Sequence, residues 1–291
     1  MSTSKQPAVT IRRATAADAE ICGRICFEAF RSLAERHNFL PDFPTAAVAT
    51  AVLSAMFSHP GFFCVVAEEN GKIVGSNCLD ERSMIGGVGP VTVDPNSQNR
   101  SAGRQLMEAA MARATERKCA GIRLVQAGYH SRSLSLYAKL GFAVREPLAC
   151  VQGPAIGKTV GGYRVRPARP EDLRTCNALC VRVHGHERGG DLGDAIHQGS
   201  AVVAESEGDI RAYASALAFS GHAVGDTNEG VEALIAGAAA FLGPGILIPT
   251  RNAELFRWCL ENGLRVTQTL TLMTMGLYNE PAGAYLPSIL F

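Results

Sequence analysis

The sequence predicts an α/β protein that contains two copies of one fold, and three observations support this. First, IRRATAADAEICGRIC (11–26) aligns without a gap to VRPARPEDLRTCNALC (165–180). Second, two further pairs of segments match in the same order, VVAEENGKI (65–73) with VVAESEGDI (202–210) and YAKLGFAV (137–144) with CLENGLRV (259–266). Blocks repeated in order indicate duplication of a whole domain. Third, short apolar runs alternate with helical patterns in each copy.

Composition shifts give the expected boundaries. The segment QGPAIGKTVGG (152–162) is rich in Gly with one Pro and is predicted to be a linker. The sequence therefore divides into a first domain over 9–151, the linker, a second domain over 163–278 and a tail over 279–291. The tail ends in LPSILF, and such an apolar end is expected to be buried on its own chain or on a partner.

Each copy begins with a strand, followed by a helix that is entered at a Pro or acidic turn, as at 169–172. In the first copy, Asn70–Gly71 between two β-rich runs predicts a hairpin of strands 62–68 and 72–79. Periodicity then predicts, in order, strand 90–93, helix 101–117, strand 122–126, helix 131–140 and strand 142–150.

Charge and composition exclude several classes of protein. A net charge of +1 over 291 residues gives no bulk attraction to nucleic acid or to a membrane surface. Neither a membrane-spanning apolar run nor an apolar signal core at the start is found, which favours a cytoplasmic protein. Nine cysteines, an odd number scattered along the chain, favour reduced thiols over a disulfide framework.

The stretch from Gly89 to Arg117 carries the strongest chemical signal. It reads as strand, turn, loop and helix, and Ser101, Ala102 and Gly103 would let a ligand approach the backbone closely. The first turn of a helix offers amide donors and favours an anion. Arg100 and Arg104 add positive charge there, where the helix dipole disfavours it unless an anion binds. The alternative is an ordinary strand–loop–helix connection with a basic first turn.

Two motifs make the first copy resemble the GNAT superfamily of N-acetyltransferases. One is Val-x-Pro followed by (Gln/Arg)-x-x-Gly-x-(Gly/Ala), which corresponds here to 93–95 and 98–103. The other is Asn-x-x-Ala-x-x-x-Tyr-x-x-x-Gly-Phe, which corresponds here to 130–142. The chain departs from these patterns at three positions: Ser101 replaces the first Gly, His130 replaces Asn and Ser133 replaces Ala.

The resemblance implies a mixed, mostly antiparallel central sheet flanked by helices in each copy. It also implies that acetyl-CoA is the acyl donor, with its diphosphate on the loop amides. The Val93 amide would stabilise the oxyanion, and the Tyr137 hydroxyl would protonate the leaving thiolate. Separately from the resemblance, Asp80 and Glu81 follow the hairpin strand and are candidate bases; the alternative is a pair of ordinary surface carboxylates at a strand end. The implied cofactor-binding residues are Thr92, Val93, Gln98, Asn99, Arg100, Ser101, Ala102, Gly103, Arg104, His130, Ser133 and Tyr137.

The second copy resembles a degenerate version of the same fold. Cys259 takes the position of Tyr137, and no Lys or Arg lies between Arg211 and Arg251. Acidic residues occupy the segment that matches the diphosphate loop, where they would repel a phosphate: Asp226, Glu229 and Glu232.

Two other groups of residues are given structural interpretations. The run His184–Gly185–His186–Glu187 has no second Cys or His pair at a metal-binding spacing, so a solvated helix end is expected and no metal. The i,i+4 cysteine pairs Cys22/Cys26 and Cys176/Cys180 are expected to pack in cores.

The sequence thus favours an acetyl-CoA-dependent N-acetyltransferase acting on a primary amine of an unidentified small molecule or peptide. A non-catalytic acyl-CoA-binding module is the alternative, and a pure interaction protein is a weaker third. A homodimer is left open.

Overall fold

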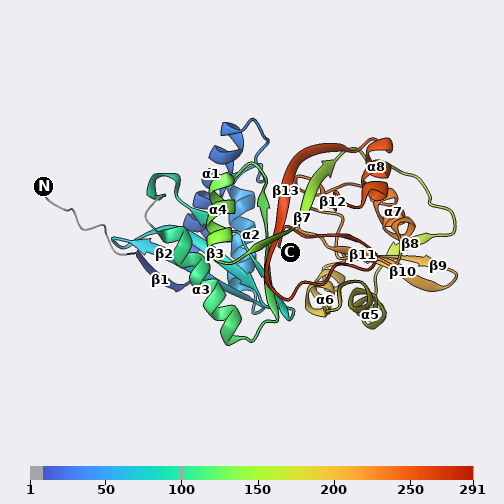
Figure 1. Ribbon diagram of the computed structural model, residues 1–291, viewed down its shortest axis with the longest axis horizontal. Coiled ribbons are helices and arrows are strands. Elements are labelled where there is room, and N and C mark those ends of the chain that lie inside the picture. Colours follow the sequence, from blue (N-terminus) through green and yellow to red (C-terminus); the bar gives the residue numbers. More distant parts are fainter. Residues whose placement is uncertain (1–8, 99–100, 291) are drawn as a thin grey trace, which may run out of the picture. The chain divides into compact units, whose positions relative to one another are not determined.

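The computed structural model describes residues 9–98 and 101–290, and the chain divides into two compact units (Figure 1). Unit 1 contains the chain up to Glu81 together with Gly86–Ile122, and unit 2 contains Arg82–Ile85 and the chain from Arg123 onward. The predicted class is confirmed, because both units combine mostly antiparallel sheet with flanking helices.

Unit 1 is built on a predominantly antiparallel set of strands. These are β1 (Val9–Arg13), β2 (Phe62–Glu69), β3 (Lys72–Asp80), β4 (Ile85–Val88, whose first residue belongs to unit 2) and β5 (Thr92–Val93). β1 pairs with β2, β2 pairs with β3, and β3 pairs with both β4 and β5. The predicted hairpin is confirmed, and its turn residues Asn70 and Gly71 both have positive φ, 52° and 72°, as a two-residue hairpin turn requires.

Three long helices complete unit 1: α1 (Ala19–Arg36), α2 (Ala46–Ser58) and α3 (Ala102–Glu116). The side chains of Cys22 and Cys26 on α1 are completely buried, which confirms their predicted place in the core. α3 inserts Leu106 into an apolar cluster formed with Val65 of β2 and Val74 of β3. This packing fixes the start of α3 relative to β3 and β5.

An equivalent ion-pair network stabilises the first strand of each copy by joining it to the turn before the first helix and to the neighbouring strand. In unit 1, Arg12 donates to the two carboxylate oxygens of Asp18 at 2.8 and 2.9 Å and to Glu68 at 2.8 Å. The matching residues of the second copy make the same contacts at 2.6 to 3.0 Å within unit 2; they are Arg166, Asp172 and Glu205. Because all six occupy aligned positions of the repeat, the network supports the inferred duplication.

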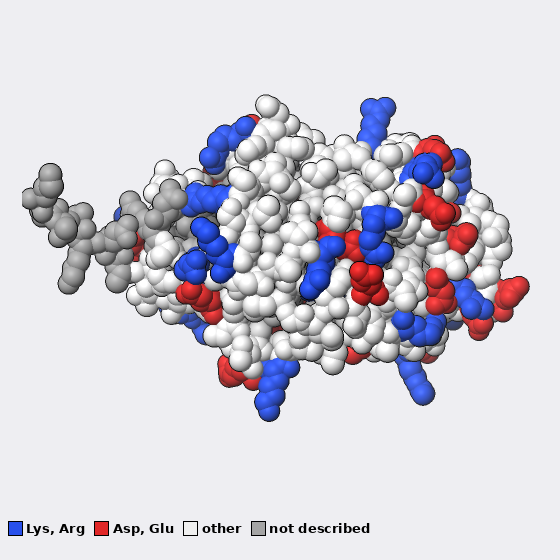
Figure 2. Space-filling view, viewed as in Figure 1, with Lys and Arg blue, Asp and Glu red and all other residues white. Residues whose placement is uncertain are grey.

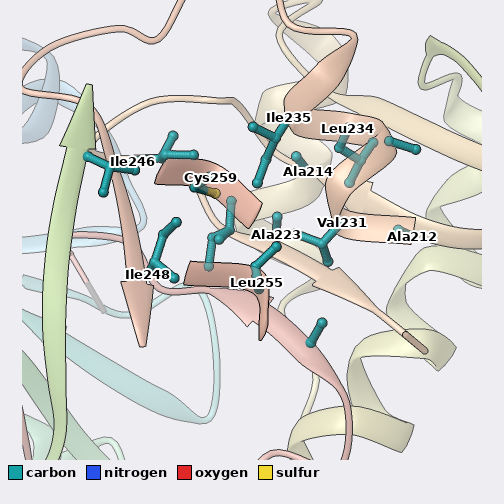
Figure 3. Close-up of a cluster of buried hydrophobic side chains, with 14 of the residues drawn as sticks. Ala212, Ala214, Ala223, Val231, Leu234, Ile235, Ile246, Ile248, Leu255 and Cys259 are labelled. Atoms are coloured by element: carbon teal, nitrogen blue, oxygen red, sulfur yellow. The ribbon is translucent and has the colours of Figure 1, made fainter. Parts of the chain in front are cut away.

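Most of unit 2 is the second copy. Its helices are α5 (Leu173–His184), α6 (Gly189–His197), α7 (Asn228–Ala236) and α8 (Ala253–Glu261). Its first sheet runs in the order β14–β11–β10–β9–β8, with bounds Ala284–Leu286, Ala223–Gly225, Asp209–Ala214, Val202–Ser206 and Arg164–Pro167. The core of the unit packs α7 and α8 against these strands and β12 (Ile246–Pro249), as the side chains of Val231, Leu255 and Ile248 illustrate (Figure 3).

Unit 2 also contains the end of the first copy, namely α4 (Ser131–Lys139), β7 (Ala143–Gln152) and most of β6 (Gly121–Ala127). β13 (Arg265–Gly276), the long strand near the end of the second copy, lies between β6 and β7. In turn, β7 lies between β13 and β12, with Leu148 opposite both Leu270 and Pro249 (Figure 1). Each copy therefore places its late strand among strands of the other copy. For this reason the boundary between the compact units does not coincide with the predicted linker. The boundaries predicted from the sequence describe where each repeat begins and ends, and they stay a prediction.

Residues 284–288 of the C-terminal tail are buried on their own chain. Ala284, Tyr285 and Leu286 form β14, which pairs with β11 and is at most 5% exposed. Ser288 then donates to the Ser220 carbonyl at 2.9 Å. The apolar residues of β14 were expected to be buried on the chain or on a partner, and they are buried by pairing with β11.

All nine cysteines are free thiols, as the composition predicted, and eight of them are buried. Among the described residues no helix is both long and apolar enough to cross a membrane. On the face shown in Figure 2, basic and acidic side chains alternate over the described part of the chain, in keeping with a net charge of +1.

Candidate active site

The predicted strand before the loop is shorter than expected, since β5 includes Thr92 and Val93 while Pro90 and Val91 lie outside it. Val93 is paired with Gly75 of β3, and the Asp94 amide donates to the Val74 carbonyl at 2.8 Å. A Cβ at Gly75 would lie 2.5 Å from the Thr92 carbonyl oxygen, so the close approach of β5 to β3 requires glycine there. The Thr92 side chain is 2% exposed and pairs with the Ser76 hydroxyl at 3.2 Å.

The turn after β5 is formed as its residue types indicate. The Asp94 carboxylate accepts from the Asn96 amide at 2.8 Å, and a 3-10 turn follows over Pro95–Ser97. The Gln98 side chain then donates to the Val93 carbonyl at 3.4 Å. Asn99 and Arg100, two of the predicted ligand-binding residues, lie outside the described residues.

The chain enters α3 through a left-handed residue. Ser101 has φ 68°, a left-handed backbone conformation that favours glycine. This conformation explains why the motif has glycine at the position that Ser101 occupies here. The Ser101 side chain makes no capping bond to the helix amides; its hydroxyl accepts instead from the Gln105 side chain at 2.9 Å. The first turn of α3 contains no acidic residue. Its amides can therefore serve an anionic ligand.

Arg104 is the one of the two predicted basic residues, Arg100 and Arg104, that lies within the described residues. It lies in the first turn of α3 and contacts Glu108 at 3.5 Å, with 44% of its side chain exposed. An exposed i,i+4 pair of this kind contributes little stability, on the order of 0.5 kcal/mol. Arg104 can therefore turn toward a diphosphate at small cost.

The second motif lies in unit 2, where α4 brings its residues together. His130 precedes the helix, and the Ser133 hydroxyl contacts the His130 carbonyl at 3.0 Å and the Gln126 side-chain oxygen at 2.9 Å. Tyr137 is 8% exposed and packs against Phe142 with ring centroids 6.2 Å apart. Burial raises the pKa of the Tyr137 phenol to about 12. The hydroxyl is therefore fully protonated at neutral pH, the form that can act as an acid.

Glu81, the candidate base, is held by arginines within unit 1. Arg113 donates to both of its carboxylate oxygens, at 2.5 and 3.1 Å, and Arg117 lies 3.7 Å away. The Glu81 side chain is 9% exposed. Both carboxylate oxygens of Glu81 are thus engaged within unit 1, and its predicted role as the base stays a prediction.

The second copy is built differently at the matching positions. Cys259 is completely buried, and burial raises the pKa of its thiol to about 12. β11 is followed directly by a turn and α7, and Asp226 at that turn pairs with Arg182 at 3.2 Å. The second copy thus differs from the first at both positions, and its degeneracy as a CoA site stays a prediction.

The sequence interpretation of His184 and His186 was wrong in one respect. They do not form a solvated helix end, because they are 3% and 2% exposed. Both lie in unit 2 beside His222, whose Nε2 is 3.2 Å from the Nε2 of His184. Helical periodicity cannot reveal such a cluster, since its members come from separate elements. Among the described residues no group of His, Cys, Asp or Glu has the arrangement of a metal site.

The comparisons with known proteins agree with the motifs. Residues 27–142 match the profile of the acetyltransferase (GNAT) family. A crystal structure from Pyrococcus horikoshii, described as an acetyltransferase, has a TM-score of 0.72 at 19% identity and covers 95% of this chain and 94% of its own.

Two further structures also match nearly the whole chain. A GCN5-related N-acetyltransferase from Sphaerobacter thermophilus gives a TM-score of 0.60 at 14% identity, covering 94% of this chain and 96% of its own. A tandem GNAT protein from the clavulanic acid biosynthesis pathway gives 0.56 at 12% identity, with coverage of 92% and 98%. At these identities the structures show a shared fold. No curated protein sequence matches the chain significantly.

Proposed function

We propose that this chain is an N-acetyltransferase that moves an acetyl group from acetyl-CoA to a primary amine of a small molecule or peptide, because residues 27–142 match the profile of the acetyltransferase (GNAT) family. The amine nitrogen attacks the thioester carbonyl directly, the C–N bond forms and the C–S bond breaks. The amine gives up a proton and the departing thiolate takes one, so the products are an amide and CoA. Both substrates are bound together, and no acyl-enzyme forms.

The single observation that carries the proposal is the connection from Thr92 to α3. It joins a strand paired to β3 to a helix that starts at a left-handed Ser101 and has no acid in its first turn. In this proposal the diphosphate binds the amides of residues 99–104, together with the side chains of Gln98, Arg100 and Arg104. Ala102 and Gly103 keep the helix start open to the ligand.

The other predicted residues take roles in the chemical step. The Val93 amide would stabilise the oxyanion as the thioester carbonyl becomes tetrahedral. Thr92 would hold the strand against β3, as its contact with Ser76 suggests. Tyr137 would protonate the thiolate, with His130 and Ser133 shaping the start of its helix. No residue is assigned as the base, because Glu81 is engaged by Arg113.

The test is Tyr137→Phe, measured by thiol release with a panel of amines. The substitution keeps the ring that packs on Phe142 and removes the hydroxyl alone. We expect turnover to fall by about 10²–10⁴-fold while CoA affinity stays the same. Tyr163→Phe, at a half-buried tyrosine of the second copy, is the matched control.

The outcome also separates the proposal from its alternative. If chemistry limits the rate and Tyr137→Phe keeps full turnover, the acid assignment fails. If the wild type binds CoA yet releases no thiol with any amine, the chain is an acyl-CoA-binding module. Calorimetry should give one CoA per chain, because acidic residues occupy the corresponding turn of the second copy; two equivalent sites would refute this.

A further inference from the structure

Unit 2 encloses a cluster of polar side chains that the proposed reaction does not use. Three histidines meet there: His184 stacks on His186 with ring centroids 5.5 Å apart and contacts His222 through their Nε2 atoms at 3.2 Å. All three are at most 3% exposed. Tyr285 of the C-terminal β14 closes the group, with its ring 5.0 Å from that of His184.

Burial holds these histidines neutral. It is the main cause that lowers the pKa of His184 and His222 well below 6.5, and it lowers that of His186 to about 4. The remaining causes include two neighbouring cations, Arg123 and Arg188, which act on all three rings. Two guanidinium groups therefore act on three neutral imidazoles, and Asp191 pairs with one of the two, that of Arg188.

Both arginines are themselves buried, Arg123 at 3% and Arg188 at 4% exposure. Arg188 pairs with Asp191 at 3.0 Å. Arg123 lies over the ring of Tyr278 at 5.3 Å. Burial and the charge of Arg188 lower the pKa of Arg123 to about 10. A negative charge placed here would relieve the repulsion between the two cations.

The histidine pair leaves two hydrogen-bonding positions open. In a neutral pair joined through Nε2, one ring donates and the other accepts, so one Nδ1 atom carries a hydrogen and the other does not. The Nδ1 atoms of His184 and His222 are both buried and have no hydrogen-bond partner within the described residues. A buried polar atom left in this state is unfavourable, because it has lost its hydrogen bonds to water. An occupant that accepts one hydrogen bond would satisfy the donor end of the pair.

From this arrangement we propose that the cluster around Arg123, His184 and His222 is a binding site for a small oxyanion, either a carboxylate of an organic acid or a phosphate. The guanidinium of Arg123 supplies charge and paired donors, and the histidine pair supplies a neutral N–H donor. The site lies wholly within unit 2 and combines Arg123 of the first copy with His184 and His222 of the second copy. It does not depend on the acetyl transfer proposed above.

The first experiment uses the wild-type full chain with ¹⁵N-labelled histidine side chains. Sodium phosphate and sodium succinate are titrated in separate arms, with sodium chloride at matched ionic strength as the control. We expect saturable shifts of the His184 and His222 Nδ1 resonances, and none for the exposed His197. Saturation by phosphate alone identifies a phosphate site, and saturation by succinate alone identifies a carboxylate site.

A variant tests the role of the guanidinium. Arg123→Met should weaken binding of the effective anion roughly tenfold to a hundredfold. Arg174→Met, at an exposed arginine of α5, should leave it unchanged. The proposal is overturned if neither anion gives a saturable shift, if chloride reproduces the shift, or if a folded Arg123→Met protein binds as well as the wild type. Should that variant fail to fold, the wild-type titration decides.

Discussion

Neutralising the central aspartate of the repeated ion-pair network should destabilise the two copies unequally. Asp18 and Asp172 each accept two bonds from their arginine and are each 7% exposed. The arginines differ, since the Arg12 side chain is 38% exposed and that of Arg166 is 16% exposed. Solvent therefore screens the first network more than the second.

The magnitude lies between two limits. Exposed ion pairs contribute about 0.2–1 kcal/mol, whereas breaking a buried pair costs about 3–5 kcal/mol. We expect Asp18→Asn to lower the free energy of unfolding by about 1–2 kcal/mol and Asp172→Asn by about 2–3 kcal/mol, because asparagine keeps the shape and loses the charge. Equilibrium urea unfolding, with hydrogen exchange of β1 and β8 to assign the loss to each copy, measures both.

The pH dependence gives an independent check. The hydrogen bonds from Arg12 and from Arg166 hold the pKa of Asp18 and of Asp172 below their usual range. The stabilisation is thus complete above the unfolded-state pKa of about 3.9 and is lost as the pH falls toward the native-state value. The difference between wild type and either variant should be constant above about pH 5 and shrink below about pH 4. An Asp172→Asn cost no larger than that of Asp18→Asn would refute the screening argument.

Five further substitutions, one of them a control, test the site and the tail. Gly103→Val should weaken CoA binding without unfolding the protein. Arg104→Glu should weaken CoA binding about tenfold or more, whereas Arg257→Glu, on the exposed face of α8, should leave it unchanged. Calorimetry measures the CoA affinity of all three variants. Glu81→Gln should lower the stability of unit 1 by about 1–3 kcal/mol through its bonds with Arg113, yet leave turnover unchanged; a hundredfold fall in turnover would restore the base assignment. Leu286→Ala, at a residue 2% exposed, should cost about 2–5 kcal/mol in thermal unfolding, and a shift of less than a degree would contradict the role of β14.

Local signals in the sequence were sufficient to predict much of the fold. The Asn70–Gly71 hairpin, the helix that begins near Ser101 and the buried cysteine faces were expected, because turn chemistry and periodicity act over a few residues. The repeat was also visible, since it preserves the charged residues of its ion-pair network. Pro90 and Val91 were wrongly included in a strand, because β propensity does not say where a partner strand ends.

What the sequence could not reveal depends on contacts between distant segments. The insertion of β13 beside β7 joins Thr274 to Ala143, and no local pattern encodes that pairing. The buried histidines come from α5, the turn after it and the residue just before β11, so their meeting is a property of the tertiary fold. The engagement of Glu81 by Arg113 was hidden for the same reason, as 32 residues separate the two. The predicted ligand-binding residues stay predictions until CoA is bound.

The exchange of β7 and β13 between the two copies means that neither copy can form its complete sheet without the other. A chain cut at the linker would leave β7 without either neighbour, since β13 and β12 both belong to the later half. The fragment would expose a long, two-edged strand, a template for aggregation. The second half is therefore needed to complete the sheet that contains β7, whatever ligand it binds. Substitutions at surface positions of the second copy can alter what it binds, whereas its strands β12 and β13 are required by β7 of the first copy.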